Sequence, residues 1–194
     1  MDYSYTRHYQ RYEYVVIRDW VTGKSVMDVG CGTAIGSFIL SAKAKSVAAV
    51  DPSLVEFIGK KFIYLSNTHA SMCAVTFCPM RFESMHKVDV AVAIEVFEHF
   101  ENPRNSVRKL SSLCDYCFFT TPLAKVTGKT ENPDHVAEYS KEDFEGIVGE
   151  SFEILERKYQ TSDMRILDEA NSNGSSYDHA HVVQMLWTRS KYAQ

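Results

Sequence analysis

The stretch Ser25–Ser37, SVMDVGCGTAIGS, decides how the fold of this chain is interpreted. It begins as an apolar run of strand length, breaks into glycines, and resumes at Ser37–Leu40 as a segment with helical character. A strand that enters a helix through a glycine turn places backbone N–H groups and a helix N-terminus at the carboxyl end of the strand, where open parallel sheets bind ligands. We therefore expect a nucleotide-like ligand at this turn.

The spacing of the glycines narrows the class of nucleotide. The dinucleotide motif G-x-G-x-x-G, counted from Gly30, requires a third glycine where this chain has Ile35, and the next glycine is Gly36. A Walker A loop requires a lysine before its Ser or Thr, and Thr33–Ser37 contains none. The turn thus disfavours both a nicotinamide dinucleotide and a nucleoside triphosphate.

Two acids near the turn favour a different ligand. Asp28 lies just before Gly30, where a carboxylate repels a pyrophosphate but suits a cationic group. Asp51 follows the apolar run Ser46–Val50, at a position where an acid accepts hydrogen bonds from a ribose diol. A cation, an amino-acid end and a free ribose together describe S-adenosylmethionine, which we expect as the ligand.

Hydrophobic runs of strand length alternate with helical patterns along most of the chain, which is typical of a parallel sheet covered on both faces. The expected strands are Ser25–Val29, Ser46–Val50, Cys73–Cys78, Val88–Ile94, Cys117–Thr120, Ser151–Tyr159 and His181–Arg189. The last two alternate as an antiparallel pair does. The sequence predicts an α/β fold, a three-layer α/β/α sandwich whose mostly parallel, seven-stranded twisted sheet ends in an antiparallel C-terminal pair.

Helical patterns and their caps occupy the segments between the strands. The N-terminal helix carries Tyr9, Tyr12, Val16, Ile17 and Trp20, with Gly23 as its expected C-cap. A second stripe, opened by Pro52, consists of Leu54, Ile58, Phe62 and Leu65. Asn102-Pro103 and Ser140-Lys-Glu-Asp143 are start signals of two further helices. We expect one domain over residues 1–194, with a helical cap at 1–22 and an aperiodic, substrate-side loop at 121–139.

Composition excludes several classes of protein. The chain has 194 residues, is 45% hydrophobic and carries a net charge of -4, so tight sequence-independent DNA binding is disfavoured. No apolar run approaches the length of a membrane-spanning helix, and an odd number of cysteines suits a reducing compartment. We expect a cytoplasmic protein without membrane partners, in which Cys114 and Cys117 line the core. No feature indicates an oligomeric state.

Four motifs in succession carry a family resemblance. They are Asp28-Val-Gly30-Cys-Gly32-Thr, Asp51-Pro, Val88-Asp89-Val90 and Glu95-Val-Phe-Glu98-His99-Phe-Glu-Asn-Pro103, and each lies at a predicted strand. In this order they closely resemble the motifs of class I S-adenosylmethionine-dependent methyltransferases, over roughly Gly23–Val148.

The resemblance implies a set of cofactor-binding residues. Asp28 and the turn Gly30-Cys31-Gly32 would border the methionine part of S-adenosylmethionine, and Asp51 would bind its ribose. Phe82, after the third strand, would flank the adenine, and Glu95 would close the site after the fourth strand.

An acid and histidine group follows the fourth predicted strand. Glu95, Glu98 and His99 stand at i, i+3 and i+4, so a helical turn puts them on one face. Together with His135 of the aperiodic loop they resemble the metal ligands of the small-RNA 3′-terminal ribose 2′-O-methyltransferases, while the first three also resemble quinone-pathway O-methyltransferases. A divalent ion such as magnesium is thus an alternative, but a hydrogen-bonded network that holds the loop is favoured.

Without a metal, His99 or His135 is the candidate general base for a hydroxyl acceptor. Tyr5 and His8 remain candidates for a lid over the acceptor, and Asp178-His-Ala-His181 for a minor metal pair. We expect methyl transfer by direct in-line attack to an oxygen of a small molecule. The alternatives are an RNA ribose and, in another class, a catalytically silent module that binds S-adenosylmethionine.

Overall fold

The computed structural model describes residues 3–54, 74–124, 127–128, 132–168 and 182–193. They form two compact units, residues 1–92 and 93–194. The expectation of one domain stays a prediction. No helix in these described ranges combines the length and the apolar character needed to cross a membrane.

The first unit is built on parallel strands. Its strands are β1 (Ser25–Val29), β2 (Ser46–Val50), β3 (Val75–Cys78) and β4 (Val88–Ile94), the last of which continues into the second unit. They lie in the order β3-β2-β1-β4. In this register Asp28 of β1 pairs with Ala49 of β2 and with Val92 of β4. The carboxyl ends of the strands therefore share one edge, as required for a ligand site of the predicted kind.

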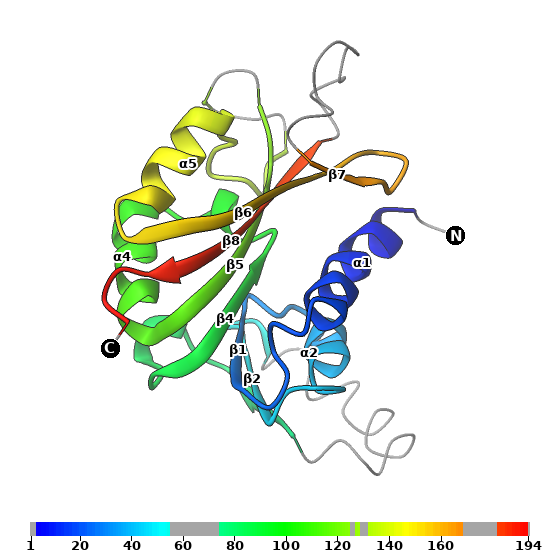
Figure 1. Ribbon diagram of the computed structural model, residues 1–194. Coiled ribbons are helices and arrows are strands. Elements are labelled where there is room, and N and C mark those ends of the chain that lie inside the picture. Colours follow the sequence, from blue (N-terminus) through cyan, green and yellow to red (C-terminus); the bar gives the residue numbers. More distant parts are fainter. Residues whose placement is uncertain (1–2, 55–73, 125–126, 129–131, 169–181, 194) are drawn as a thin grey trace. The chain divides into compact units, whose positions relative to one another are not determined.

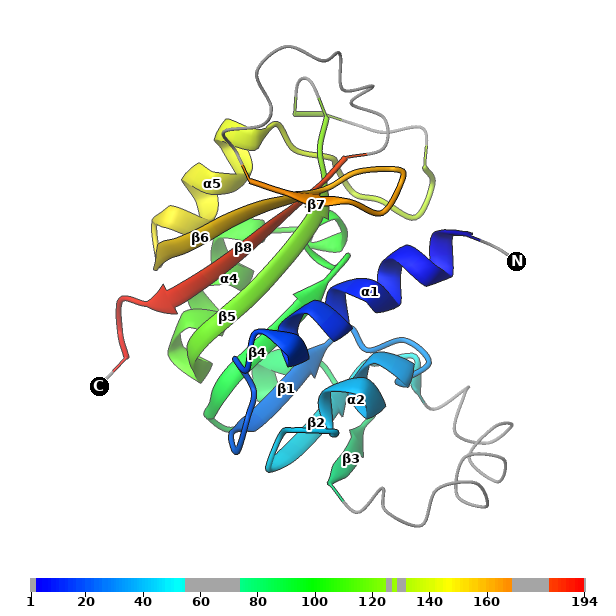
Figure 2. The same cartoon turned by 45° about the vertical axis from the view of Figure 1, so that its right-hand side comes forward.

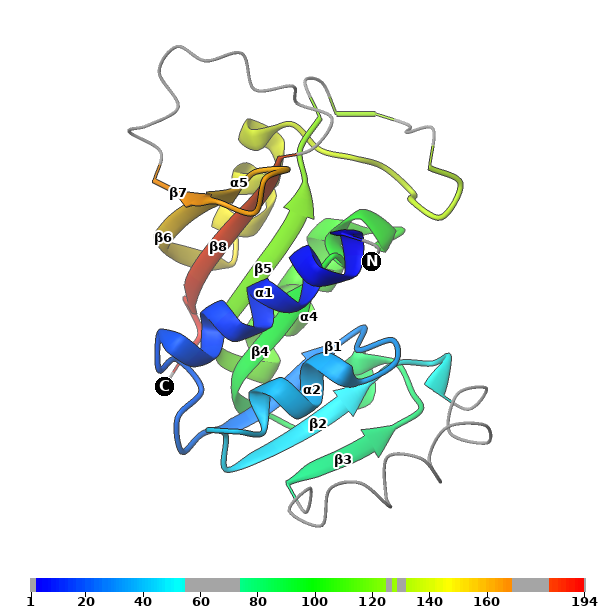
Figure 3. The ribbon, with the colours of Figure 1, turned by 90° about the vertical axis from the view of Figure 1, so that its right-hand side faces the viewer.

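Two helices cover one face of these strands. They are α1 (Tyr3–Ile17) and α2 (Ile35–Leu40), and a 3-10 turn, η1 (Phe82–Ser84), precedes β4. Figure 3 shows α2 lying across β1 and β2, with α1 beside it. The expected C-cap at Gly23 is wrong, because α1 ends at Ile17 and the chain turns at Asp19, whose φ is 57°.

The second unit combines helices with antiparallel strands. Its elements are η2 (Phe97–His99), α4 (Pro103–Leu113), β5 (Cys114–Pro122), α5 (Lys141–Gly149), β6 (Phe152–Gln160), β7 (Ile166–Leu167) and β8 (Val183–Ser190). The strands lie in the order β5-β8-β6-β7, and each of these neighbours pairs antiparallel. Figure 1 shows α4 and α5 side by side along these strands.

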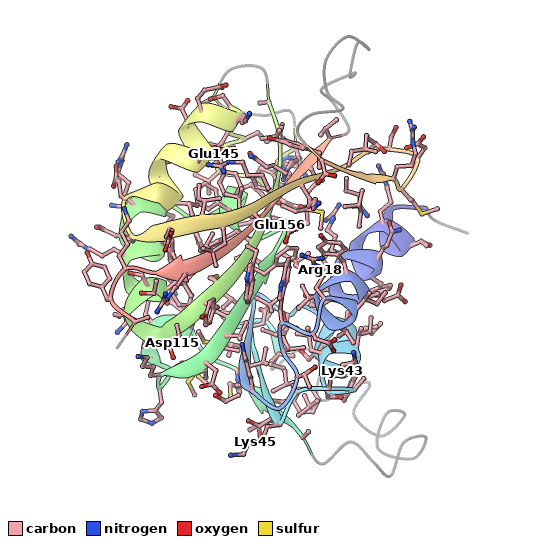
Figure 4. The ribbon with its side chains drawn as sticks, in the orientation of Figure 1. Arg18, Lys43, Lys45, Asp115, Glu145 and Glu156 are labelled. Atoms are coloured by element: carbon pink, nitrogen blue, oxygen red, sulfur yellow. The ribbon has the colours of Figure 1, made fainter. Side chains whose placement is uncertain are left out.

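The start signals of both helices act as predicted. The side chain of Asn102 accepts a hydrogen bond from Asn105 N at 3.2 Å, and Pro103 is the first helical residue of α4. Ser140 Oγ accepts from Asp143 N at 3.2 Å at the start of α5. Glu145, labelled on α5 in Figure 4, accepts from Arg157 Nε of β6 at 3.0 Å, which fixes this helix to its strand.

The strand predictions were correct at the apolar runs and wrong at the bounds of β5 and in the number of strands. β5 begins at Cys114 rather than Cys117 and continues to Pro122. The described strands number eight rather than seven, because β7, the short strand that Figure 2 shows beside the end of β6, was not expected. Only two residues form it, too few for a sequence pattern. Cys114 and Cys117 are fully buried free thiols, as predicted.

Several predictions fall outside the described residues. They concern the helix beyond Leu54, the start of the third strand at Cys73, the side chains of Tyr3 and Tyr5, and the Asp178–His181 segment.

Candidate functional site

The glycine turn, residues 30–34, has the backbone that its sequence requires. Gly30 and Gly32 have φ values of 67° and 51°, in the left-handed region that glycine enters without strain. The backbone N–H groups of Gly30 and Cys31 both donate to the carbonyl of Val50, at 2.8 and 3.2 Å. The turn is therefore fastened to the end of β2, next to the acid that follows that strand.

Asp51 holds the glycine turn with one of its oxygens. Its Oδ2 accepts from Gly32 N at 3.0 Å, and its Oδ1 accepts from the backbone N and the hydroxyl of Ser53 at 2.8 and 2.7 Å. A carboxylate oxygen accepts about two hydrogen bonds, so Oδ2 retains acceptor capacity in this half-buried side chain. Asp51 can thus accept a hydrogen bond from a ligand hydroxyl, in the orientation that its hydrogen bonds to Ser53 fix.

The side chain of Asp28 is more completely buried than a ligand-contacting residue needs to be. It has no exposed surface, and its two oxygens accept from Tyr12 OH at 3.1 Å and Ser37 Oγ at 2.6 Å. Burial raises the pKa of Asp28 to about 7, although both hydrogen bonds lower it, and the charge of Asp51 raises it further. The expected role of Asp28 toward a cationic group stays a prediction, and both its oxygens already serve the helices above it.

Two other predicted cofactor residues are buried. Phe82 is the first residue of η1 and has 7% of its surface exposed. The side chain of Cys31 packs in a core group with Ala34, Ala49 and Leu54. Burial, and then the charges of Asp28 and Asp51, raise the pKa of its thiol. Cys31 therefore offers a ligand its backbone rather than its sulfur.

Glu95 directly follows β4 with an unusual backbone. Its φ is 54°, which costs energy in a residue other than glycine and is found mostly at functional sites. The backbone N of Glu95 donates to Thr120 Oγ1 at 3.1 Å, and that hydroxyl donates to Glu95 Oε1 at 3.2 Å. Thr120 thereby fixes both the backbone and the carboxylate of Glu95.

The second unit brings Glu98, His99 and His135 together; we call them the histidine cluster. One ligand atom from each lies within 4.8 Å of the others, and Glu95 is not part of this group. Glu98 is fully buried and accepts from Thr121 Oγ1 at 3.1 Å. The expected common face of Glu95 and the other two is not formed, because only residues 97–99 are helical.

Hydrogen bonds place the proton of both imidazoles on Nδ1, and the two rings differ in what meets Nε2. His99 Nδ1 lies 2.7 Å from the carbonyl oxygen of Asp134, and because a carbonyl only accepts, Nδ1 carries the proton. Nε2 of the neutral ring of His99 then has a lone pair, and this side chain is exposed. His135 instead accepts at Nε2 from the amide of Asn132 and donates from Nδ1 to Glu138, both at 2.9 Å.

The backbone ties the aperiodic loop to the same turn. Val136 N and Ala137 N both donate to the carbonyl of Glu98, at 2.9 and 3.3 Å. The ring of His135 lies edge-on to that of His99, with centroids 5.1 Å apart. The predicted loop-holding network is thus present in the described part of the loop.

The sequence did not predict four hydroxyl donors of the site: Tyr12, Ser37, Thr120 and Thr121. Each donates a hydroxyl to one of the predicted acids. A signal existed only for Ser37, which directly follows the displaced Gly36. The others belong to apolar patterns and become polar partners only through tertiary packing.

Comparisons with known proteins agree with the resemblance. A family model described as a methyltransferase domain matches residues 9–188. No match was found among curated protein sequences.

Three solved structures illustrate the likeness. The N-methyltransferase NodS from Bradyrhizobium japonicum, in complex with S-adenosylhomocysteine, is 13% identical over 98% of this chain and 88% of its own, with a TM-score of 0.64. The 1,6-didemethyltoxoflavin N1-methyltransferase from Burkholderia thailandensis is 12% identical over 94% and 78%, with a TM-score of 0.69. Magnesium protoporphyrin IX methyltransferase from Synechocystis, with bound S-adenosylmethionine, is 19% identical over 95% and 81%, with a TM-score of 0.67. The expected Rossmann-like α/β fold is confirmed.

Proposed function

Because the chain belongs to the class I S-adenosylmethionine-dependent methyltransferases, we propose that it transfers the methyl group of this cofactor to an oxygen of a small-molecule acceptor. The observation that carries the choice of oxygen is the tautomer of His99, whose Nδ1 proton is held by the carbonyl of Asp134. An exposed imidazole nitrogen with a lone pair suits removal of a hydroxyl proton.

The glycine turn is the proposed cofactor seat. The backbone of Gly30, Cys31 and Gly32 borders the methionine part, and Asp51 accepts from the ribose through the acceptor capacity left on Oδ2. Phe82 lies beside the adenine, and Glu95 contributes its fixed carboxylate to the rim. Positioning supplies most of the rate in a direct displacement at the methyl group.

The acceptor hydroxyl is proposed to bind at the histidine cluster. His99 takes its proton as the oxygen attacks the methyl carbon, the bond from that carbon to sulfur breaks, and the sulfonium becomes a neutral thioether. His135 positions the loop rather than exchanging protons, because Asn132 and Glu138 occupy both its ring nitrogens. The small size of the acceptor is favoured by the acidic net charge and by the small-molecule substrates named for two of the similar structures.

Magnesium, the ion expected as an alternative, fits the histidine cluster poorly. Magnesium prefers oxygen ligands, whereas this group offers one carboxylate and two imidazoles. His135 must also release Asn132 or Glu138 before it can coordinate an ion. We therefore propose a metal-independent reaction, with the metal-assisted RNA ribose methyltransferase as the alternative.

Incubation with methyl-labelled S-adenosylmethionine and fractionated cell extract tests the acceptor class. The proposal expects label in the small-molecule fraction, in an ether or ester linkage. Label in RNA, or on nitrogen or carbon, would overturn the acceptor assignment. Cofactor binding with no labelled product from any fraction would instead support the silent binding module.

A further inference from the structure

Asp28 is shared by two helices in the first unit. Its Oδ1 accepts from Tyr12 OH of α1, and its Oδ2 accepts from Ser37 Oγ of α2. Tyr12 and Ser37 are themselves fully buried, with at most 1% of their surfaces exposed. The acid therefore joins α1 to the helix that begins at the glycine turn.

Gly36 makes room for this connection. A Cβ on Gly36 would lie 2.2 Å from Cζ of the Tyr12 ring and 2.4 Å from two further ring carbons, closer than real Cβ contacts. Gly36 lies within α2 and is not among the residues with positive φ, so its backbone would accept an alanine. The absence of a side chain at Gly36 thus leaves room for the ring of Tyr12, which packs directly on α2.

We propose that Tyr12 is a positioning residue of the cofactor site, held by Asp28, whose two oxygens serve α1 and α2 instead of meeting the ammonium group of the cofactor. The inference rests on the proposed function, because the turn that Tyr12 braces is the proposed cofactor seat. Displacing Tyr12 frees α1 from α2 and from Asp28, and the segment from Gly30 to Ser37 loses its cover.

The groups that face Asp28 act on its ionisation in both directions: the charge of Asp51 opposes it, and the hydrogen bonds from Tyr12 and Ser37 favour it. These groups are Tyr12 from α1, with Arg11 acting on Tyr12, Ser37 from α2, Cys31 from the glycine turn, and Asp51 after β2. Burial first, and then the charge of Asp28, hold the pKa of Tyr12 well above its ordinary value. Burial likewise raises the pKa of Asp28 to about 7.

The raised pKa gives the contact a defined pH dependence. A carboxyl whose pKa is raised on folding contributes fully below its unfolded value, near 3.8, and its contribution is lost as the pH rises through about 7. The bracing of α1 should therefore be tightest in mildly acidic solution.

The first experiment compares Tyr12→Phe, Gly36→Ala and the control Tyr9→Phe, which lies on the same helix beside His8. Binding of S-adenosylhomocysteine is measured by calorimetry, and stability by thermal unfolding. Tyr12→Phe keeps the ring on Gly36 but removes the donor, so binding should weaken about threefold to tenfold. Gly36→Ala should weaken it at least about tenfold, because the added Cβ displaces the ring.

A double variant isolates the contact. Gly36→Ala combined with Tyr12→Ala should bind no more weakly than Tyr12→Ala alone, since the ring that the Cβ meets is gone. Binding and unfolding of Tyr12→Phe and Gly36→Ala equal to those of Tyr9→Phe would overturn the inference. A wild-type chain that binds no cofactor product would overturn the proposed function instead, and thermal unfolding would still decide whether Tyr12 braces α1.

The second experiment tests the protonation of Asp28. The unfolding midpoint of the wild type should fall relative to that of Asp28→Asn as the pH rises from 5 to 8, because the amide stays neutral. The carboxyl carbon of Asp28, followed by NMR in the wild type, should titrate near pH 7 even if the variant does not fold. A midpoint below pH 5 would show a solvated carboxylate outside the buried contact with Tyr12, and would overturn the inference.

Discussion

A fully buried carboxylate lies just before the glycine turn of the first unit, Asp28, and another lies in the histidine cluster of the second, Glu98. Each accepts a hydrogen bond from a hydroxyl, from Ser37 in one case and Thr121 in the other. The two regions differ in what they leave available. Around the turn, the side-chain oxygens of Asp28 and Asp51 accept hydrogen bonds from the backbone and from the helices. The cluster instead leaves a lone pair on one imidazole nitrogen of His99, whose side chain is exposed.

This difference separates binding from chemistry. A cofactor seat needs a fixed backbone and one oriented acceptor, which the turn supplies through Gly30, Gly32 and Asp51. Proton transfer needs a lone pair on a group that can reach the substrate. His99 supplies one at Nε2, because its Nδ1 is fixed by a backbone carbonyl. Changes in the two regions should therefore have different kinetic effects.

The largest difference is expected between the two histidines of the cluster. His99→Gln should lower kcat about 100-fold or more while leaving the affinity for S-adenosylhomocysteine unchanged, because it removes only the base. His135→Gln is the matched change and should cost less than about tenfold, through a loosened loop. Steady-state kinetics with the identified acceptor, and calorimetry, measure both. A larger loss of kcat in His135→Gln would reverse the assigned roles.

A smaller effect is expected from the hydroxyls that serve the two buried carboxylates. Ser37→Ala and Thr121→Val should each lower the free energy of unfolding by about 1–3 kcal/mol, because each leaves a buried acceptor without its donor. The exposed Ser112, whose hydroxyl donates to the carbonyl of Lys109, provides the control Ser112→Ala, with an expected change within about 0.5 kcal/mol. Urea unfolding measures all three. If both changes lower the free energy of unfolding no more than Ser112→Ala does, the two carboxylates do not depend on these hydroxyls.

The smallest effect is expected from removal of metal ions. Dialysis against a chelator should leave kcat unchanged within about twofold, and added magnesium should not raise it, because His135 is already engaged by Asn132 and Glu138. Loss of turnover that a divalent ion restores would favour the metal-assisted alternative and place the cluster among the cofactor-binding regions.

The sequence predicted those features that depend on local pattern. The apolar runs of β1, β2 and β4 were placed correctly because buried parallel strands are nearly continuous in hydrophobic residues. The caps at Asn102 and Ser140 were found because a cap is recognised within one turn of its helix. The antiparallel pairing of β6 and β8 followed from alternation alone.

Tertiary contacts could not be predicted in the same way. Tyr12 fitted the apolar stripe of a helix, and nothing local indicates that its hydroxyl meets Asp28, 16 positions away. For the same reason the burial of Asp28 beneath two helices was not anticipated, while its expected role toward a ligand stays a prediction. The tautomer of His99 depends on the carbonyl of Asp134, which carries no sequence signal. Hydrogen bonds between residues far apart in the sequence thus determined the roles that the sequence did not predict.

Calorimetric titration of the wild type and of Asp51→Ala with S-adenosylmethionine tests the central claim most directly. The wild type should bind one equivalent, and Asp51→Ala should bind at least about tenfold more weakly, since the ribose loses a charged acceptor and Gly32 N loses its partner. Thermal unfolding of both proteins identifies any loss that comes from misfolding. Equal affinity in a folded Asp51→Ala variant would contradict the assignment of the glycine turn as the cofactor seat.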